Sequence, residues 1–297
     1  MGDKVTKVAI FSDIHSNFLV FNKALEDAKK NDIDLYLFLG DYIADGFDDN
    51  LILDAIKSKN MYAINGNREY SVINYDKVKN NDLKESEQYR SLIYCCEHLN
   101  KENLEFIKTL DMYKIIDIEG KKICMSHSRP DALESCIIHN SYKEFDKLIE
   151  NYPADIYIFG HQHKWFCTKY KEKHFLNPGS IGLPRNGLPY NYGILEIDED
   201  IKFIKKEVHY EYAKLEKYYR SSDYYKFATI WCELLLKVMK EGHNYPFYFV
   251  TKIREMAKLE NIDISKHIPN ELFRRCYYEY IEDAKIKDIY KFDYLME

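Results

Sequence analysis

Five short apolar runs in the first two-thirds of the chain each end in a turn that contains histidine, aspartate or asparagine. The runs are four to seven residues long, which is typical of strands buried on both faces of a sheet. They cover residues 5–11, 35–39, 61–64, 122–125 and 156–159. Segments with helical character, such as 18–30 and 50–57, lie between them, so the predicted fold class is α/β.

The polar residues after these runs are expected to meet, because open α/β sheets bind ligands beyond the carboxyl ends of their strands. They are Asp13, His15, Asp41, Asn67, His127, His161 and His163. Nitrogen and oxygen donors of this kind suit divalent ions such as Mn, Fe, Co, Ni or Zn, and suit Ca or a zinc–thiolate site poorly. Seven ligands are too many for one catalytic ion. They fit two ions about 3.5–4 Å apart that share one carboxylate.

Each motif alone has a simpler interpretation. Asp-x-His can be a turn with a surface histidine, and Gly40-Asp41 is an ordinary turn dipeptide. Gly-His-x-His is more specific, since the glycine and histidine content gives about 0.01 chance occurrences per chain of this length. All five motifs, each after a predicted strand, favour a site for two metal ions.

The ordered motifs, followed by Asn177-Pro178-Gly179-Ser180, resemble the calcineurin-like metallophosphoesterase superfamily, and more closely its small bacterial phosphodiesterase-like branch. The resemblance covers roughly residues 5–208 and implies a four-layer α/β/β/α sandwich. It also implies one metal ion at Asp13, His15 and His163, a second at Asn67, His127 and His161, and Asp41 as the bridge. We expect two divalent ions, Mn²⁺ first, with Fe, Ni, Co or Zn as alternatives.

Two positions depart from the family pattern. Many members have histidine after the Gly-Asn motif, whereas this chain has Arg68, which cannot donate a proton near neutral pH. Arg68 could still bind phosphoryl oxygens, so leaving groups of low pKa are favoured. Ser16 stands where many relatives of this branch have glycine, and we expect little effect. Arg129 is a second candidate for substrate binding, with an exposed surface role as the alternative, and Arg185 is expected to brace its loop.

The predicted function is a metal-dependent phosphoric ester hydrolase that acts on small phosphodiesters or nucleotides, including dinucleoside polyphosphates. A hydroxide that bridges the two ions would attack phosphorus. Asp41, Asn67, Arg68 and His127 are the predicted catalytic residues, and Arg68 and Arg129 are the predicted substrate-binding residues. A phosphoprotein phosphatase is the alternative, because the superfamily contains both and the ligands do not distinguish them. A non-catalytic scaffold on the same fold is a further alternative, and it predicts lost ligands.

The chain changes character after residue 209, which gives a predicted catalytic domain at 1–209 and a helical appendage at 210–297. Apolar residues recur at helical spacing in 227–239, and Gly242 can end that helix. The appendage contains 13 of the 27 tyrosines. Packing in a core or in a homo-oligomer interface is favoured for them over stacking on a nucleobase.

The composition of the chain limits the kinds of partner that it is expected to bind. The net charge of −6 argues against binding to duplex nucleic acid, and no apolar run approaches the ~18 residues of a membrane span. The partner that remains is a small phosphorylated substrate. Seven cysteines without a CxxC pair indicate a reduced, cytoplasmic location. The expected strand at 5–11 begins so early that we expect no signal peptide.

Overall fold

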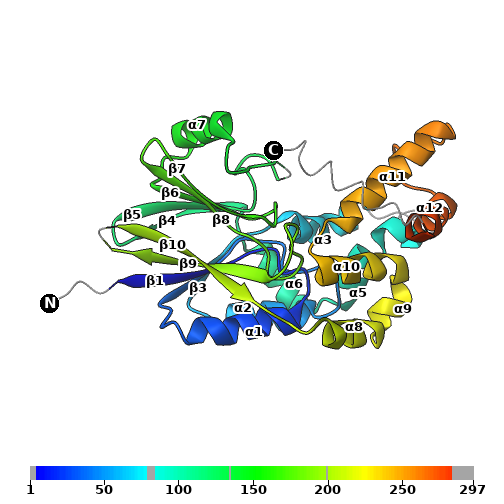
Figure 1. Cartoon of the computed structure of the whole chain (residues 1–297), viewed down its shortest axis with the longest axis horizontal. Coiled ribbons are helices and arrows are strands. Elements are labelled where there is room, and N and C mark those ends of the chain that lie inside the picture. The colour runs from blue at the N-terminus through cyan, green and yellow to red at the C-terminus, as the bar shows by residue number, and fades with distance from the viewer. Residues whose placement is uncertain (1–4, 79–83, 134, 199, 283–297) are drawn as a thin grey trace.

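The computed structural model describes residues 5–78, 84–133, 135–198 and 200–282, and it contains two five-stranded sheets (Figure 1). The strand order of the first sheet is β10 (Ile201–Val208), β9 (Tyr190–Ile197), β1 (Thr6–Phe11), β2 (Leu35–Phe38) and β3 (Met61–Ala63). The order of the second is β4 (Tyr113–Ile118), β5 (Lys121–Ser126), β6 (Ile156–Phe159), β8 (Lys173–Pro178) and β7 (Trp165–Tyr170). The strands β1, β2 and β3 run parallel, as do β5, β6 and β8, and the remaining pairings are antiparallel.

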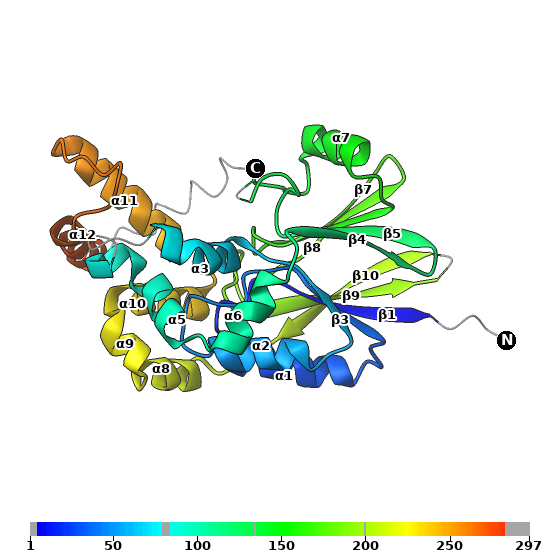
Figure 2. The same ribbon diagram turned by 180° about the vertical axis from the view of Figure 1, so that it is seen from behind.

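The two sheets pack face to face, with helices on both outer faces (Figure 1). Aliphatic side chains fill the space between the sheets, among them Val8, Ile10, Ile123 and Ile158. On the outer face of the first sheet lie α1 (Phe18–Lys29) and α2 (Asp49–Lys57), and α6 (Lys101–Lys108) contacts α2. α5 (Arg90–His98) lies beyond the sheet, among the C-terminal helices (Figure 2). On the outer face of the second sheet, α7 (Tyr142–Asn151) packs onto Tyr157 and Phe175. The predicted four-layer α/β/β/α sandwich is therefore confirmed.

All five predicted strands that precede the polar turns are confirmed, as β1, β2, β3, β5 and β6. The edge strands of the second sheet, β4 and β7, were not predicted from the sequence. Both contain lysine and threonine or aspartate and have exposed positions, so neither forms an apolar run. β8 lies between β6 and β7, and it runs parallel to β6 and antiparallel to β7.

The C-terminal region is helical, as predicted, and Gly242 ends α10 in the left-handed conformation, with φ 72°. Its helices are α8 (Tyr212–Arg220), α9 (Asp223–Phe227), α10 (Thr229–Glu241), α11 (Tyr245–Leu259) and α12 (Asn270–Glu282). Two further elements precede them in the chain, α3 (Asn67–Val78) and a 3₁₀ turn at Glu87–Tyr89. Figure 2 shows α9 beside α5, which it contacts.

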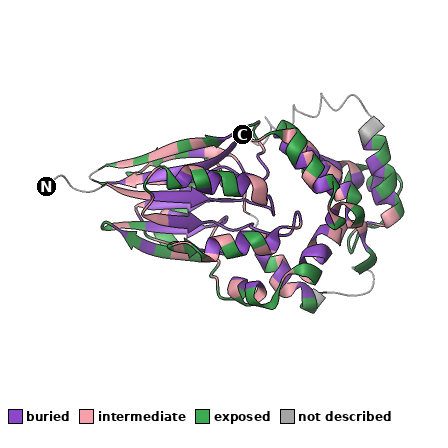
Figure 3. Ribbon diagram, turned by 90° about the horizontal axis from the view of Figure 1, so that it is seen from below, coloured by how far each residue is buried: buried purple, intermediate pink, exposed green. Residues whose placement is uncertain are grey.

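One apolar core runs across the predicted domain boundary at residues 209 and 210. A single cluster of buried residues includes Phe11 of β1, Phe21 of α1, Leu235 of α10 and Phe273 of α12. Figure 3 shows buried positions on the appendage helices as well as in the strands. Among the described residues of the appendage six tyrosines are buried, which confirms the packing interpretation for them; they are Tyr219, Tyr224, Tyr245, Tyr248, Tyr277 and Tyr280.

Two further features concern membrane spans and disulfide bonds. In the part of the chain that the structure describes, no helix is both long and apolar enough to cross a membrane. The seven cysteines, all within the described residues, have free thiols.

Replacing Leu235 with alanine tests the shared core. Leu235 is 1% exposed, so Leu235→Ala should lower the free energy of unfolding by about 2–5 kcal/mol. Leu259→Ala is the control, because that leucine is 82% exposed and the change should stay within about 0.5 kcal/mol. Urea denaturation followed by circular dichroism measures both. If the helical appendage of Leu235→Ala unfolded in a separate transition at lower urea concentration, and the sheets unfolded as in the unchanged protein, the core would not be shared.

Candidate metal centre

The seven predicted ligands meet at the carboxyl ends of the parallel strands of both sheets. Asp13 and His15 follow β1, Asp41 follows β2, and Asn67 lies at the start of α3, beyond β3. The second sheet contributes His127 after β5, and His161 and His163 after β6. The inter-sheet core fixes the ends of these strands, so ligands that are far apart in the sequence lie side by side.

The first group of ligands is Asp13, His15 and His163. The Nε2 atom of His163 lies 3.1 Å from the Oδ1 atom of Asp13 and 3.1 Å from the Nε2 atom of His15. The Nε2 atom of His15 lies 3.8 Å from the same aspartate oxygen. All three side chains are buried. This spacing allows one ion to contact all three.

The second group joins the first through Asp41. Its Oδ2 atom lies 3.8 Å from the Nε2 atom of His15 and 3.5 Å from the Nε2 atom of His127. The Oδ1 atom of Asn67 lies 3.1 Å from the Nε2 atom of His127 and 3.2 Å from the Nδ1 atom of His161. One carboxylate oxygen thus lies between two sets of donors, where the predicted bridging ligand would have to be.

The histidine tautomers make this donor set suitable for cations. The Nδ1 atom of His15 faces the Asp45 carboxylate at 2.8 Å, that of His127 faces the Leu39 carbonyl at 2.7 Å, and that of His163 faces the Leu183 carbonyl. Each neutral imidazole therefore donates its proton from Nδ1 and turns its Nε2 lone pair inward. Lone pairs that face one another at 3.1 Å repel unless a positive charge lies between them. These residues therefore fit divalent metal ions.

Charge within the cluster shifts the pKa values of its members in opposite directions. Burial alone would raise the pKa of Asp13, but His163 and His15 lower it well below its usual range. Burial alone would lower the pKa of His127, but the Asp41 carboxylate raises it to about 9. Burial lowers the pKa of both His161 and His163 to about 4. Without metal, protons therefore concentrate on some of the imidazoles, where they compete with cations.

The backbone at the ligands is in a conformation that residues with side chains rarely adopt. Five of the seven ligands have left-handed φ angles of 46–64°; they are Asp13, His15, Asp41, His161 and His163. Such a residue costs on the order of 1 kcal/mol or more and persists only where its surroundings hold it.

The loop at 177–183 supplies part of that restraint. Ser180 donates its hydroxyl hydrogen to the Asp13 carbonyl at 2.8 Å, and the Gly182 N–H donates to the same oxygen at 3.0 Å. The Asn177 side chain donates to the Gly160 carbonyl at 2.8 Å. The Asn-Pro-Gly-Ser motif therefore braces two ligand loops without supplying a ligand.

Glu69 connects two further ligand loops, and the sequence analysis missed it. Its buried carboxylate accepts N–H groups of Asp41, Tyr42 and Gly66 at 2.7–2.9 Å. Burial, and then Asp41, raise its pKa to about 7. Gly66 allows the Asp41 side chain to lie close to the backbone, since a Cβ atom at position 66 would lie 2.3 Å from the Oδ1 atom of Asp41. A glutamate three residues after a glycine, in the first turn of a helix, was the available signal.

Asp45 and Ser16 lie behind the ligands. The buried Asp45 carboxylate contacts His15 and Arg68, with the Nη2 atom of Arg68 at 2.9 Å. The Ser16 hydroxyl donates to buried Asp49, which also accepts the Ala44 N–H at 3.0 Å. The expectation that Ser16 has little effect needs correction, because its hydroxyl is bonded to the segment after β2.

The arginines differ from the prediction. Arg129 donates to both oxygens of Asp131 at 2.7 and 2.8 Å and to Glu144 at 2.6 Å, so these contacts do not support a substrate-binding role for it. Arg185 forms no ion pair with any described carboxylate, and its Nη1 atom reaches the His161 carbonyl only at 3.5 Å. Burial lowers the pKa of Arg185, Asp13 opposes this, and the positive charge of Arg68 lowers it further.

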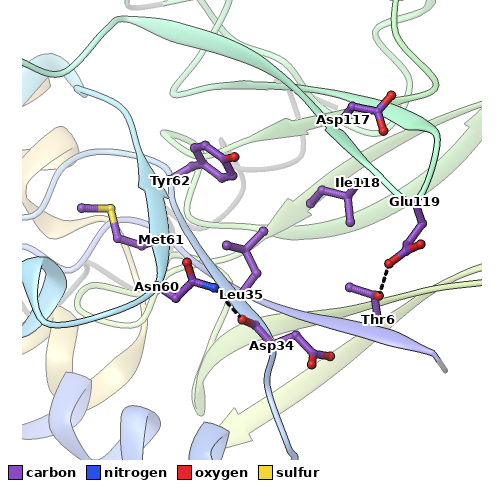
Figure 4. A pocket seen from close by; sticks show the side chains of 9 residues that line it. All are labelled: Thr6, Asp34, Leu35, Asn60, Met61, Tyr62, Asp117, Ile118 and Glu119. Carbon is purple, nitrogen blue, oxygen red and sulfur yellow. Dashed lines mark hydrogen bonds between the residues drawn. The ribbon is translucent and has the colours of Figure 1, made fainter.

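A cavity of about 880 Å³ lies away from this cluster, at the amino ends of β1, β2 and β3 (Figure 4). Its polar lining residues are Thr6, Asp34, Asn60, Asp117 and Glu119. Thr6 donates to Glu119 at 2.7 Å, and Asn60 donates to the Asp34 carbonyl at 3.0 Å. The cavity has no histidine or cysteine in its lining and does not resemble the ligand cluster.

Comparison with known families agrees with this geometry. The model of the calcineurin-like phosphoesterase superfamily domain matches residues 6–200. The chain belongs to this superfamily. Within it, an uncharacterized protein of Methanocaldococcus jannaschii, MJ0912, is 27% identical over 223 residues, which cover 70% of this chain and 89% of the relative.

Two solved structures share the fold. The metallophosphoesterase of Sphaerobacter thermophilus superposes with a TM-score of 0.64 at 19% identity and covers 80% of this chain and 100% of its own. The hypothetical protein PH1004 of Pyrococcus horikoshii superposes with a TM-score of 0.64 at 20% identity, over 80% of this chain and 98% of its own.

Binding of a metal ion should release protons from this protein. A pKa of about 9 keeps His127 protonated at pH 7 without metal, and a bound ion would displace that proton. Apparent Mn²⁺ affinity should therefore rise as the pH increases from about 7 towards the pKa of His127 and then level off. Calorimetry in two buffers of different ionisation enthalpy counts the protons released, and we expect about one from His127.

His161 provides the matched control. Its pKa of about 4 leaves it neutral at pH 7, so His161→Gln should weaken binding without changing the number of protons released. His127→Gln should weaken binding and also reduce that number by about one. An affinity that does not change between pH 7 and 9 would contradict the assignment of the proton to His127.

Proposed function

We propose that this protein hydrolyses small phosphodiesters or nucleotides, dinucleoside polyphosphates among them, with two divalent metal ions. The observation that supports the proposal best is the inward-facing donor set, in which Asp41 lies between two groups of ligands. In our proposal Asp13, His15 and His163 hold one ion and Asn67, His127 and His161 hold the other, with Asp41 shared. Mn²⁺ is the first expectation, and Fe, Ni, Co or Zn also suit these donors.

The chain's own groups would keep this site preorganised. Divalent ions at these donors would polarise a phosphoryl oxygen and make water nucleophilic at neutral pH. The carbonyls of Leu39 and Leu183 and the carboxylate of Asp45 hold three imidazoles in one tautomer, so their Nε2 atoms need no reorientation. Asn67 would add a ligand without adding negative charge. The scaffold alternative predicts lost ligands, whereas all seven are present and close together.

Two guanidinium groups are suited to bind the phosphoryl oxygens of a substrate. Arg68 is oriented by Asp45, and its buried Nε atom has no hydrogen-bond partner among the described residues. Arg185 has no ion-pair partner among those residues either, and the positive charge of Arg68 lowers its pKa. An oxyanion bound by both guanidinium groups would reduce this repulsion between like charges. We infer that Arg185, rather than Arg129, acts with Arg68 in binding substrate.

The residue types near the site favour substrates with good leaving groups. The four histidines of the cluster are assigned as ligands, and Arg68 cannot give up a proton near neutral pH. Departing oxygens that are stable as anions need no proton donor. Phenolates, and the nucleoside phosphates or pyrophosphate released from pyrophosphate linkages, meet this condition, whereas alkoxides released from alkyl esters do not.

Three expectations from the sequence stay predictions: the cytoplasmic location, the absence of duplex nucleic acid as a partner, and a homo-oligomer through the helical appendage.

The phosphoprotein phosphatase alternative is decided by a panel of substrates. It should contain a bis-aryl phosphate, an aryl monophosphate, cyclic nucleotides, a dinucleoside tetraphosphate and a phosphopeptide. Preference for the phosphopeptide would overturn the proposed substrate class.

Replacing the shared ligand tests the activity itself. With Mn²⁺ present, Asp41→Asn should reduce hydrolysis of a bis-aryl phosphate by at least about 100-fold, because the change removes a charge between both groups of ligands. Asp131→Asn removes an aspartate that pairs with Arg129, and it should change the rate by less than about twofold. Full activity of Asp41→Asn would refute the proposed mechanism.

The arginines can be separated by kinetics. Arg185→Ala and Arg68→Ala should each lower kcat/KM by about 10–100-fold, since each removes a charged donor to the phosphoryl group. Arg129→Ala should leave kcat/KM within about twofold, because Arg129 is already paired with two carboxylates. The opposite order, with Arg129 the more damaging substitution, would restore the interpretation from the sequence.

A further inference from the structure

Asp45 is a buried junction behind the metal centre. Its Oδ2 atom accepts the Nδ1–H of His15 at 2.8 Å and forms an ion pair with the Nη2 atom of Arg68 at 2.9 Å. Its Oδ1 atom accepts the indole N–H of Trp231, in α10 of the helical appendage, at 3.0 Å. One carboxylate therefore contacts a candidate metal ligand, a candidate phosphate-binding cation and a residue 186 positions further along the chain.

Each of the three contacts restrains the same rigid group. A carboxylate can rotate about its Cβ–Cγ bond, and that rotation would move both oxygens away from their partners. The hydrogen bond from Trp231 restrains this rotation at Oδ1, while His15 and Arg68 restrain it at Oδ2. Without it, the buried Oδ1 atom would have no hydrogen-bond partner among the described residues, which favours reorientation of the group.

Other side chains of the appendage also contact segment 44–48, but the groups that they contact do not hold a candidate metal ligand. The Tyr218 hydroxyl donates to Asp48 at 2.9 Å. The Tyr224 hydroxyl pairs with Ser91 at 2.7 Å, and Ser91 donates to the Ala44 carbonyl at 2.7 Å. These contacts hold segment 44–48 against α8–α10. The hydrogen bond of Trp231 differs, because its acceptor also holds the side chain of His15.

We propose that Trp231 is a positioning residue of the metal centre and that the helical appendage sets the orientation of His15 and Arg68 through Asp45. The inference rests on the proposed function in one respect, the assignment of His15 as a metal ligand. It goes beyond that function because it gives a residue outside the phosphoesterase sandwich a role in preparing the site. Partners of buried metal ligands typically affect metal affinity by about 10–100-fold.

The test compares Trp231→Phe with Tyr218→Phe. Each keeps an aromatic ring and removes a single donor from the appendage to an aspartate of the same loop. Trp231→Phe should weaken Mn²⁺ binding by about 10-fold and lower kcat, whereas Tyr218→Phe should keep the affinity within about twofold. Unfolding curves of the metal-free variants show whether both lose similar stability. Equal Mn²⁺ affinity in Trp231→Phe and the unchanged protein would overturn the inference.

A double-mutant cycle excludes a merely structural role. If Trp231 acts through Asp45, Trp231→Phe should weaken Mn²⁺ binding little further in an Asp45→Asn background. Additive losses from the two substitutions would show that Trp231 acts by another route and would reject the proposal.

A readout without metal separates the failure of this inference from the failure of the proposed function. The ¹⁵N imidazole signals of His15, assigned with His15→Gln, report its tautomer in the metal-free protein. They should shift in Trp231→Phe and stay unchanged in Tyr218→Phe. If the unchanged protein bound no divalent ion, the proposed function would fail, and the ¹⁵N signals would still decide whether Trp231 orients His15. Unshifted signals in Trp231→Phe would reject that link.

Discussion

The close approach of buried polar side chains at the ligand cluster is the constraint on which the rest of the structure depends. Two imidazole nitrogens lie 3.1 Å apart with their Nδ1 atoms already turned to other acceptors, and the Asp13 and Asp41 carboxylates lie within 4 Å of the same imidazoles. Such groups would not gather on a flexible chain. They are held because each follows a strand whose other residues are fixed in the core between the sheets. The aliphatic sandwich is therefore what positions the polar site.

Holding the ligands this way stores free energy in the backbone and in the electrostatics. Five ligands have left-handed φ angles, and burial opposes the charged form of both aspartates. Hydrogen bonds from Ser180, Asn177 and Glu69 offset part of this cost by tying the ligand loops together. A bound cation would offset more, since it binds the folded chain and not the unfolded one. The strain is thus greatest where binding can relieve it.

The sequence predicted the parts of this arrangement that depend on local patterns. An apolar run and the polar residue at its end are neighbours in the chain, so β1, β2, β3, β5 and β6 and all seven ligands could be found. The edge strands β4 and β7 lack such a run. The different partners of Arg129 and Arg185 could not be predicted: Glu144, on α7, neutralises Arg129, and no described carboxylate pairs with Arg185. Asp45 was not singled out, since its three partners come from distant segments.

Asp45 also connects the two ways in which this chain differs from a minimal phosphoesterase sandwich. Arg68 stands where many members have histidine, and its guanidinium needs a buried counter-charge, which Asp45 provides at 2.9 Å. A buried carboxylate in turn needs donors for both oxygens, and one oxygen is already shared by Arg68 and His15. The donor to the other oxygen comes from α10. An arginine at position 68 and a tryptophan in the appendage are therefore not independent features: each helps to satisfy the same charge, and the helices extend the site rather than merely adjoin it.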